Sequence, residues 1–295
     1  MRPPVIPGYE TICEPPHVYY VRSEWKRFLI DHLRESFASI GAADRTAHGD
    51  GRTPHFAYAP EGAPGRVLVR RAVRASAASI LGDLYVSPRR FVREIEASDA
   101  AHRKGLCVPE IVAARLTRAG PFFYRYTIVV REVADASNLL SLARSAPSSL
   151  KRRVTRELGE AVRRMHDAAV YHGDLTMKNI LVSGLPSEAR RANRENGGSA
   201  KEGVGSGLSI HFIDFDGSRF EAARRGALAE GNLSRLNRSA VKLFATDGTI
   251  TRSDKFRFLV AYAGDRQEAR RLARRCGRSL WMHQLWWRLT GQGAS

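Results

Sequence analysis

The stretch of sequence that decides the fold is Tyr171-His172-Gly173-Asp174-Leu175-Thr176-Met177-Lys178-Asn179-Ile180-Leu181-Val182. Its partner is a second short stretch, Ile210-His211-Phe212-Ile213-Asp214-Phe215-Asp216. The apolar residues 180–182 and 210–213 are typical of two buried strands. If these strands pair in antiparallel fashion, Asp214 lies beside the loop that carries Asp174 and Asn179. The two stretches therefore predict a cluster of two carboxylates and one amide.

Such a cluster suits phosphoryl transfer, in which a protein supplies positioning and charge rather than covalent chemistry. Asn179 and Asp214 would hold magnesium, and Asp174 would orient the hydroxyl group that receives the phosphoryl group. The patterns His-x-Asp-x-x-x-x-Asn and Asp-Phe-Gly fill these roles in protein kinases. In this chain Gly173 replaces the usual Arg, and Asp216 replaces the usual Gly.

A structural alternative is that His172 and Asp174 cap a turn and that Asp214 ends a surface strand. We prefer the kinase interpretation because Asp214 follows an apolar run, which is a poor place for a residue that serves solubility alone. His172 is expected to hold the loop by side-chain hydrogen bonds rather than to transfer a proton.

Length, composition and charge narrow the class of protein. The 295 residues suffice for a two-lobed catalytic unit, and no apolar run approaches the ~20 residues that a membrane helix needs. The N-terminus lacks the apolar region of a secretory signal, and the three cysteines are widely separated, so we expect a cytoplasmic protein. The formal net charge of +18 predicts a polyanionic partner. No usual nucleic-acid-binding motif is present, so we expect no nucleic acid partner.

Residues 1–50 are predicted to form an N-terminal extension with a strand at 17–21 and an amphipathic helix capped by Ser23. The apolar stripe of that helix is expected to pack on the catalytic unit, because its polar face mixes acids and bases.

Residues 51–134 are predicted to form a small lobe of strands, with a glycine-containing turn at 60–65. Arg70, at the end of the strand 66–71, is our candidate for the cation on the ATP phosphates, and Arg71 is the second choice. Glu94 is the expected partner of this cation, and Glu96 is the competing choice. The alternative is that both arginines are solvated strand residues, since protein kinases use a lysine here and no Gly-x-Gly-x-x-Gly loop is visible.

Residues 135–295 are predicted to form a larger, mainly helical lobe after a hinge at 132–134. Ser148 or Ser149 is expected to cap a long helix that leads to the catalytic loop, and residues 184–209 form a polar insertion that we expect to be mobile. A helix at 231–243 carries three cations that are candidates for binding an anionic substrate, Arg235, Arg238 and Lys242. Such a cluster is more often a solvated face. The basic, tryptophan-bearing segment 270–288 suits either a lipid headgroup interface or core packing.

The motifs together resemble the lipopolysaccharide kinase family, whose members include 3-deoxy-D-manno-octulosonic acid (Kdo) kinase and core heptose kinases. The resemblance covers roughly residues 51–263, and its most specific part is the helix motif Asn232-Leu233-Ser234-Arg235-Leu236-Asn237-Arg238-Ser239. It implies an α+β, protein-kinase-like two-lobed fold, ATP and Mg²⁺ as cofactors, and Lys178 as a further residue of the ATP site. It also implies a lipid A–core acceptor at the cytoplasmic face of an inner membrane, with peripheral association to that anionic surface.

The sequence thus predicts an ATP-dependent kinase of a sugar hydroxyl in lipopolysaccharide, with Kdo on lipid A as the favoured acceptor and no obligate protein partner. A second hypothesis is a small-molecule phosphotransferase of the aminoglycoside or choline kinase kind, which also carries His-Gly-Asp. Cationic acceptors need acidic pockets, however, and the net charge argues against one. A third hypothesis is a degenerate kinase that binds nucleotide or lipid without turnover.

Overall fold

The computed structural model describes residues 3–41, 44, 46–48, 55–71, 83–186, 207–221, 225–244 and 249–276, with 46–48 and 225 described by their backbone alone. Within these residues the chain divides into two compact units. The first comprises Met1–Arg103 and Val108–Ala134, and the second comprises Lys104–Cys107 and the described residues from Asp135 onward. The first unit is rich in strands and the second is mainly helical.

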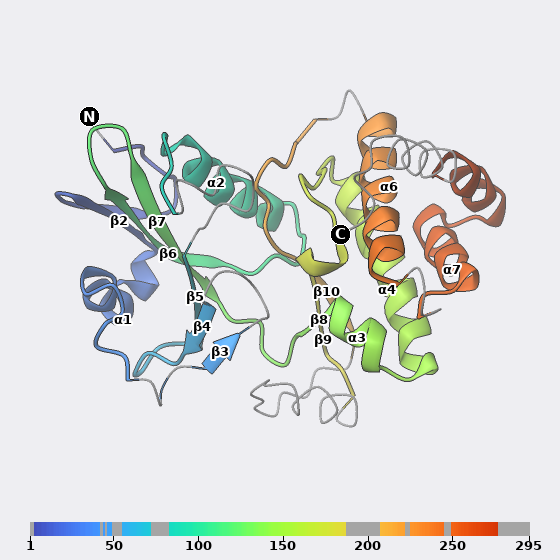
Figure 1. Ribbon diagram of the computed structural model, residues 1–295, viewed down its shortest axis with the longest axis horizontal. Helices are drawn as coiled ribbons and strands as arrows, with labels where there is room; N and C mark the ends of the chain where they lie inside the picture. Colours follow the sequence, from blue (N-terminus) through green and yellow to red (C-terminus); the bar gives the residue numbers. More distant parts are fainter. Residues whose placement is uncertain are drawn as a thin grey trace. The chain divides into compact units, whose positions relative to one another are not determined.

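The first unit is built on one seven-stranded antiparallel sheet (Figure 1). Its strands are β1 (Glu10–Glu14), β2 (His17–Val21), β3 (Thr46–His48), β4 (His55–Tyr58), β5 (Val67–Arg71), β6 (Ile111–Arg118) and β7 (Tyr124–Arg131). They are arranged in the order β1-β2-β6-β7-β5-β4-β3. The strands predicted at 17–21, 66–71 and 124–131 are confirmed.

The N-terminal residues belong to this sheet. β2 pairs with β6 from His17 opposite Thr117 to Val21 opposite Ala113, and β1 pairs with β2 along its whole length. The described part of 1–50, predicted as an N-terminal extension of strand plus helix, therefore belongs to the same compact unit as the strands of the predicted small lobe. The sequence concealed this because strand partners far apart in the chain leave no local signal.

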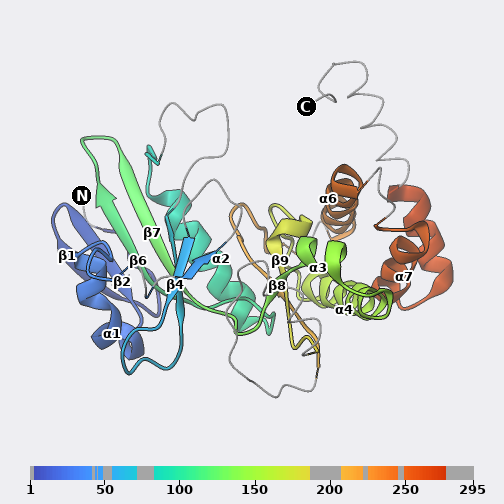
Figure 2. The same ribbon diagram turned by 60° about the horizontal axis from the view of Figure 1, so that its bottom comes forward.

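Two helices cover opposite faces of the sheet (Figures 1 and 2). α1 (Ser23–Arg34) buries Trp25, Leu29 and Leu33 against one face, and α2 (Arg89–Arg103) buries Phe91 and Ile95 against the other. The predicted cap at Ser23 is wrong: the N-cap position is Arg22, and no side chain caps this helix end.

The second unit packs helices against a small three-stranded sheet of order β10-β9-β8 (Figure 1). Its elements are β8 (Ser137–Asn138), α3 (Leu139–Ser145), α4 (Ser148–Asp167), the short 3₁₀ helix η3 (Met177–Asn179), β9 (Ile180–Ser183), β10 (Ser209–Phe212), α6 (Arg225–Phe244) and α7 (Arg252–Ala263), with a further helix at 266–276. Among the described residues, no helix combines the length and apolar character that a membrane crossing requires.

Helix α4 is the centre of this unit. The predicted stripe of Leu150, Val154, Leu158, Val162 and Met165 is buried throughout. Pro147 occupies the N-cap position and no side chain caps the helix, so the predicted cap at Ser148 or Ser149 is wrong. The site-bearing loop begins shortly after its last turn.

Strands β9 and β10 pair antiparallel, with Ser209 opposite Ser183 and Phe212 opposite Ile180. This confirms the predicted pairing of the two apolar stretches. The strand ends on either side of the insertion are paired, so the insertion lengthens one turn without interrupting the ladder. Residues 187–206 of this insertion, and residues 277–295 with their tryptophans, lie outside the described residues.

Candidate active site

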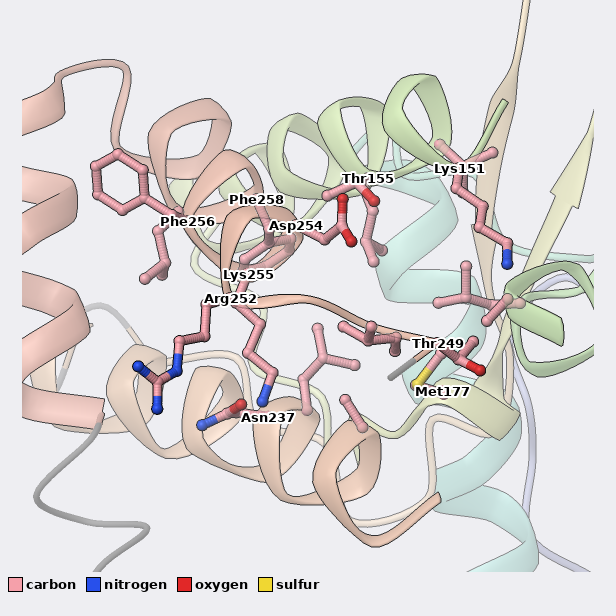
Figure 3. A pocket seen from close by; sticks show the side chains of 18 of the residues that line it. Lys151, Thr155, Met177, Asn237, Thr249, Arg252, Asp254, Lys255, Phe256 and Phe258 are labelled. Carbon is pink, nitrogen blue, oxygen red and sulfur yellow. The ribbon is translucent and has the colours of Figure 1, made fainter. Parts of the chain in front are cut away.

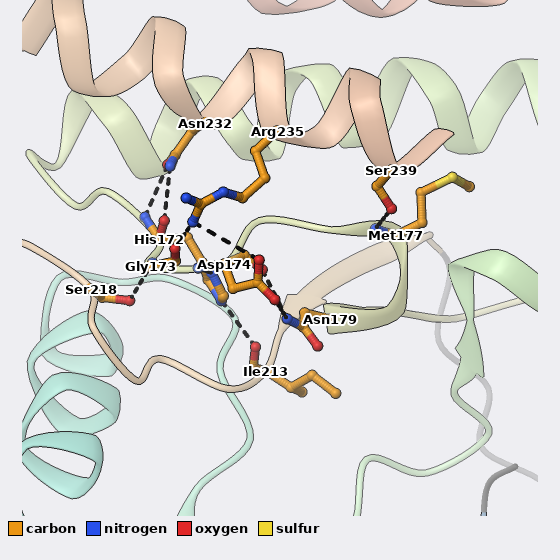
Figure 4. Close-up of polar contacts among 10 residues, drawn as sticks. All are labelled: His172, Gly173, Asp174, Met177, Asn179, Ile213, Ser218, Asn232, Arg235 and Ser239. Atoms are coloured by element: carbon orange, nitrogen blue, oxygen red, sulfur yellow. Dashed lines mark hydrogen bonds and ion pairs between the residues drawn. The ribbon is translucent and has the colours of Figure 1, made fainter. Parts of the chain in front are cut away.

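His172 holds the catalytic loop to the end of β10 (Figure 4). Its Nδ1 accepts a hydrogen bond from the Asp174 backbone N–H at 3.0 Å, and its Nε2–H donates to the Ile213 carbonyl at 3.0 Å. The ring must be neutral to make both bonds, and burial lowers the pKa of His172 accordingly. The predicted structural role of this histidine is confirmed.

Asn232 of α6 fixes the backbone of His172 on both sides (Figure 4). Its side-chain oxygen accepts from the His172 N–H at 2.9 Å, and its side-chain nitrogen donates to the His172 carbonyl at 2.8 Å. The same oxygen accepts from His166 Nε2 at 3.2 Å. Asn232 is buried, and water does not reach this part of the loop backbone. These bonds therefore take the place of hydrogen bonds to water.

Two serines complete the support of the loop. The hydroxyl oxygen of Ser218 accepts from the Gly173 N–H at 3.0 Å, and that of Ser239 accepts from the Met177 N–H at 3.2 Å. Backbone polar groups of the loop are thus satisfied by side chains that come from distant parts of the chain.

Gly173 is required by the segment that follows Asp214. A Cβ atom at this position would lie 2.1 Å from the carbonyl oxygen of Asp216 and 2.6 Å from the carbonyl carbon of Gly217. Both are backbone atoms, so they could make room only if the main chain itself moved. This close approach explains why a residue with a side chain, such as the arginine of protein kinases, does not fit here.

Asp174 and Asn179 meet at the two ends of the loop (Figure 4). The Asn179 side-chain nitrogen donates to the Asp174 carbonyl at 2.8 Å and reaches the carboxylate oxygen Oδ2 at 3.4 Å. The Asp174 side chain is 60% exposed, so a substrate hydroxyl can reach it. With its nitrogen turned toward Asp174, Asn179 retains its side-chain oxygen for a cation.

Asp214 is placed beside Asn179 by the ladder that joins β9 and β10. Beyond the last strand pair, the Ile213 N–H donates to the Asn179 carbonyl at 3.0 Å. Asp214 follows in a left-handed conformation with φ of 65°. The predicted neighbourhood of Asp174, Asn179 and Asp214 is therefore present.

The donor set fits magnesium. One carboxylate and one amide oxygen are hard ligands of the kind that Mg²⁺ prefers, and this ion commonly takes its remaining ligands from water and phosphate oxygens. The described residues contain no cluster of three or more histidine, cysteine, aspartate or glutamate side chains suited to a metal. Asn179 and Asp214 would hold the ion together with a phosphate-bearing ligand.

A polar pocket of about 500 Å³ opens beside this loop. It is lined by residues 171–173 and by four arginines, Arg219, Arg235, Arg238 and Arg275. Arg235 donates to the Gly173 carbonyl and lies 3.9 Å from the Asp174 carboxylate. Burial and the nearby Arg235 lower the pKa of Arg238. Lys242 is exposed and does not line this pocket, so the predicted three-cation cluster is divided.

In the first unit, Arg70 and Glu94 form an ion pair between β5 and α2. Glu94 is buried, whereas Glu96 and Arg71 are exposed, so the structure selects Arg70 and Glu94 from the predicted pairs. The turn at 60–65 lies at the opposite end of β5, because β5 begins at Val67 and Arg70 pairs with His55. The predicted turn at 60–65 therefore does not adjoin Arg70. The loop before His55, residues 49–54, is outside the described part of the chain.

Lys178 is exposed on η3, and its backbone carbonyl accepts from the Asn138 side chain at 2.8 Å. This bond ties the loop to the start of α3 and leaves the ammonium group in solvent. The prediction that Lys178 binds ATP stays a prediction.

A second pocket of about 570 Å³ lies between helices of the second unit (Figure 3). Its wall is mostly apolar, with Leu142, Leu236 and Leu259 among the lining residues and Met177 of the catalytic loop at one end. Lys151, Arg252 and Lys255 are the cations around it (Figure 3). Burial lowers the pKa of Lys255.

Sequence reasoning missed Asn232, Ser218 and Ser239 as supports of the loop, and Arg219 as a pocket residue. Asn232 lies within the most specific motif of the resemblance, and its place on the apolar side of α6 was the available signal. Ser239 closes the same motif, whereas nothing in the local sequence marks Ser218.

The fold and this site define a kinase-like protein, in which a loop between helix and strand carries Asp174 and Asn179 and the next strand carries Asp214. The model of the "Lipopolysaccharide kinase (Kdo/WaaP) family" matches residues 80–262, and the chain belongs to this family.

Two relatives of known name agree with this family. The chain is 30% identical over 153 residues to the 3-deoxy-D-manno-octulosonic acid kinase of Photobacterium damsela subsp. piscicida, covering 52% of each protein. It is 36% identical over 167 residues to the kinase of the same name from Photobacterium profundum, covering 55% of this chain and 59% of the relative. The chain thus spans little more than half the length of these relatives.

A solved structure titled "WaaP in complex with acyl carrier protein" matches with a TM-score of 0.55 and 21% identity, over 90% of this chain and 96% of that one. This likeness concerns the fold alone. It confirms the predicted α+β, protein-kinase-like fold class.

Proposed function

We propose that the protein is an ATP-dependent kinase that phosphorylates a sugar hydroxyl of the lipopolysaccharide inner core, with Kdo attached to lipid A as the favoured acceptor. The observation that carries this proposal is the loop in which Asp174, Asn179 and Asp214 are held together by His172 and by the β9–β10 ladder. Asp174 would accept the proton of the acceptor hydroxyl as the phosphoryl bond forms.

Four residues are candidates for holding nucleotide and metal. Asn179 and Asp214 would hold Mg²⁺, which neutralises developing charge on the phosphates when it is bound. Arg70 would contact the ATP phosphates, and the buried Glu94 would fix its guanidinium group. An arginine suits this task because its planar donors match phosphate oxygens. Lys178 would provide a further cation for ATP.

The acceptor is expected to be anionic because of the arginine-lined pocket beside Asp174. In the described part of the chain, neither Arg219 nor Arg238 forms an ion pair. Two cations without counter-ions, close to Arg235, raise the local positive potential and favour a carboxylate or phosphate. Kdo is an acidic sugar, which accounts for such a pocket. The same feature argues against an aminoglycoside or choline acceptor, since these are cations.

We further propose that the apolar pocket of the second unit accommodates an acyl chain. Its apolar wall suits a hydrocarbon chain, and Lys151, Arg252 and Lys255 suit an acidic group at the end of that chain. The solved structure reported above contains acyl carrier protein, so an acyl chain delivered by such a carrier is a candidate ligand of this pocket. Peripheral association with an anionic inner membrane at the cytoplasmic face also follows from a lipid-linked acceptor and the net charge of +18.

The deciding experiment is phosphate transfer from radiolabelled ATP with Mg²⁺, with and without Kdo-bearing lipid A. We expect acceptor-dependent transfer by the unmodified protein, and loss of transfer with retained nucleotide binding in Asp174→Asn. Arg238→Gln should raise the acceptor KM more than it lowers kcat, whereas Lys242→Gln serves as a control on the same helix. ATP binding without transfer to Kdo-bearing or heptose-bearing acceptors would instead support the degenerate, binding-only hypothesis.

A further inference from the structure

The hairpin of β6 and β7 carries an exposed apolar tip. Phe122 is 70% exposed, and Val86, in the segment that precedes α2, is 58% exposed. Single exposed apolar residues are ordinary on protein surfaces. Here, however, the two belong to chain segments that are hydrogen-bonded to one another.

The tip is an ordered structure. The Ala119 N–H donates to the Phe123 carbonyl at 2.8 Å and closes the turn. Tyr85 and Tyr124 exchange two backbone hydrogen bonds of 2.8 Å, so Val86 lies next to the end of the hairpin. The exposed side chains are thus held in place and do not result from a loosely attached loop.

The tip also extends past the neighbouring strands (Figures 1 and 2). β5 pairs with β7 only as far as Thr127, and β2 pairs with β6 only as far as Thr117. Residues 119–123 therefore project beyond the last paired residues on both sides. Phe122 would therefore be among the first side chains to contact a surface that approached this end of the first unit.

Arginines surround the apolar tip. Arg118 donates to the Gly120 and Pro121 carbonyls at 3.1 and 3.3 Å, which keeps its guanidinium at the turn. Arg125 pairs with Asp83 at 2.8 Å, and the exposed Arg89 follows Val86 closely in sequence. Among the described residues, Arg118 and Arg89 form no ion pair. The balance of charge at the tip is positive.

We propose that this hairpin tip inserts into an anionic lipid bilayer, with Phe122 and Val86 at headgroup depth and Arg118, Arg125 and Arg89 on lipid phosphates. Aromatic side chains favour the membrane interface, and nearby cations are attracted to anionic leaflets. A protein partner fits less well, because two small apolar side chains fall far below the ~1,000 Å² that a stable protein interface needs. The proposal does not depend on which sugar is phosphorylated.

The test is co-sedimentation of the full chain with vesicles of phosphatidylcholine alone or with added phosphatidylglycerol. We expect binding to the anionic vesicles only, weakened by salt. Phe122→Ser should reduce the vesicle affinity about fivefold or more, and Arg118→Gln should reduce it by a smaller factor. Phe220→Ser is the matched control, because Phe220 is an exposed aromatic residue of the second unit.

The thermal midpoint of each variant should equal that of the unmodified protein, which excludes unfolding as the cause of a lower vesicle affinity. Equal vesicle affinity of Phe122→Ser and Phe220→Ser would overturn the proposal, even if the chain binds membranes through another segment. Phe122-dependent binding to an acidic protein, without binding to anionic vesicles, would also overturn it in favour of a protein partner.

Discussion

Replacing Asn232 by alanine should destabilise the second unit strongly, because this one side chain satisfies a buried backbone on both sides. The substitution removes the bonds of 2.9 and 2.8 Å to the His172 N–H and carbonyl, and the bond of 3.2 Å from His166. A buried polar group left unsatisfied costs about 1–3 kcal/mol. Two such groups on His172 give a loss of about 2–6 kcal/mol in the free energy of unfolding, a large part of the ~5–15 kcal/mol of a typical domain.

Phosphate transfer should fall as well, at temperatures where the variant is still folded. His172 orders the Asp174 backbone through its Nδ1, so freedom at His172 would move the residue that we propose to orient the acceptor hydroxyl. Mispositioning of a catalytic group by about 1 Å can cost on the order of 100-fold in rate. The expected effect is therefore on kcat rather than on nucleotide affinity.

The assay is urea unfolding followed by circular dichroism, together with turnover at a temperature well below each thermal midpoint. Asn232→Asp is the informative companion, since it retains the acceptor oxygen but loses the donor to the His172 carbonyl. Lys242→Ala, an exposed change on the same helix, is the control. A destabilisation by Asn232→Ala no greater than that of Lys242→Ala would refute the reasoning.

Four further outcomes are expected. Gly173→Ala should abolish transfer or prevent folding, because its Cβ would meet a backbone oxygen at 2.1 Å; normal turnover would contradict this. Glu94→Gln should raise the KM for ATP, whereas Glu96→Gln, an exposed change, should not. Because burial lowers the pKa of His172 below its ordinary 6.5, folding stability should fall as the pH drops from about 6.5 toward 5, and urea midpoints measure it. A long-chain fatty acid should raise the thermal midpoint of the unmodified protein, and Ala240→Phe should abolish this rise by filling the apolar pocket. A rise that persists in Ala240→Phe would mean that the acyl chain binds elsewhere.

Part of the site followed from local pattern. Two short apolar runs, each next to a polar cluster, predicted the β9–β10 pair and thereby the meeting of Asp174, Asn179 and Asp214. The predicted pairing of Arg70 with Glu94 is also present, because a strand and a following helix of fixed period present few inward positions. Arg71 and Glu96 were open alternatives that only burial separated.

Other features had no local signature. Ser23, Ser148 and Ser149 have the residue type of helix caps, yet Arg22 and Pro147 occupy the N-cap positions of α1 and α4. A favourable N-cap residue stabilises a helix by only about 1 kcal/mol, so the path that the chain takes into the helix can override this preference. Likewise, the strand predicted at 17–21 gave no sign of its partner, because β2 pairs with β6, a strand far along the chain.

The sequence by itself predicted the family resemblance and the meeting of Asp174, Asn179 and Asp214, since the two apolar runs beside these residues predict one strand pair. The tertiary structure alone decided how that loop is held and what surrounds it. Asn232, Ser218 and Ser239 come from other segments to satisfy its backbone, the turn after Asp214 excludes any side chain at position 173, and Arg219 joins Arg238 in one pocket. The physical reason is that hydrogen-bond satisfaction and close packing act through space, whereas sequence patterns report only on neighbours within a strand or a helical turn.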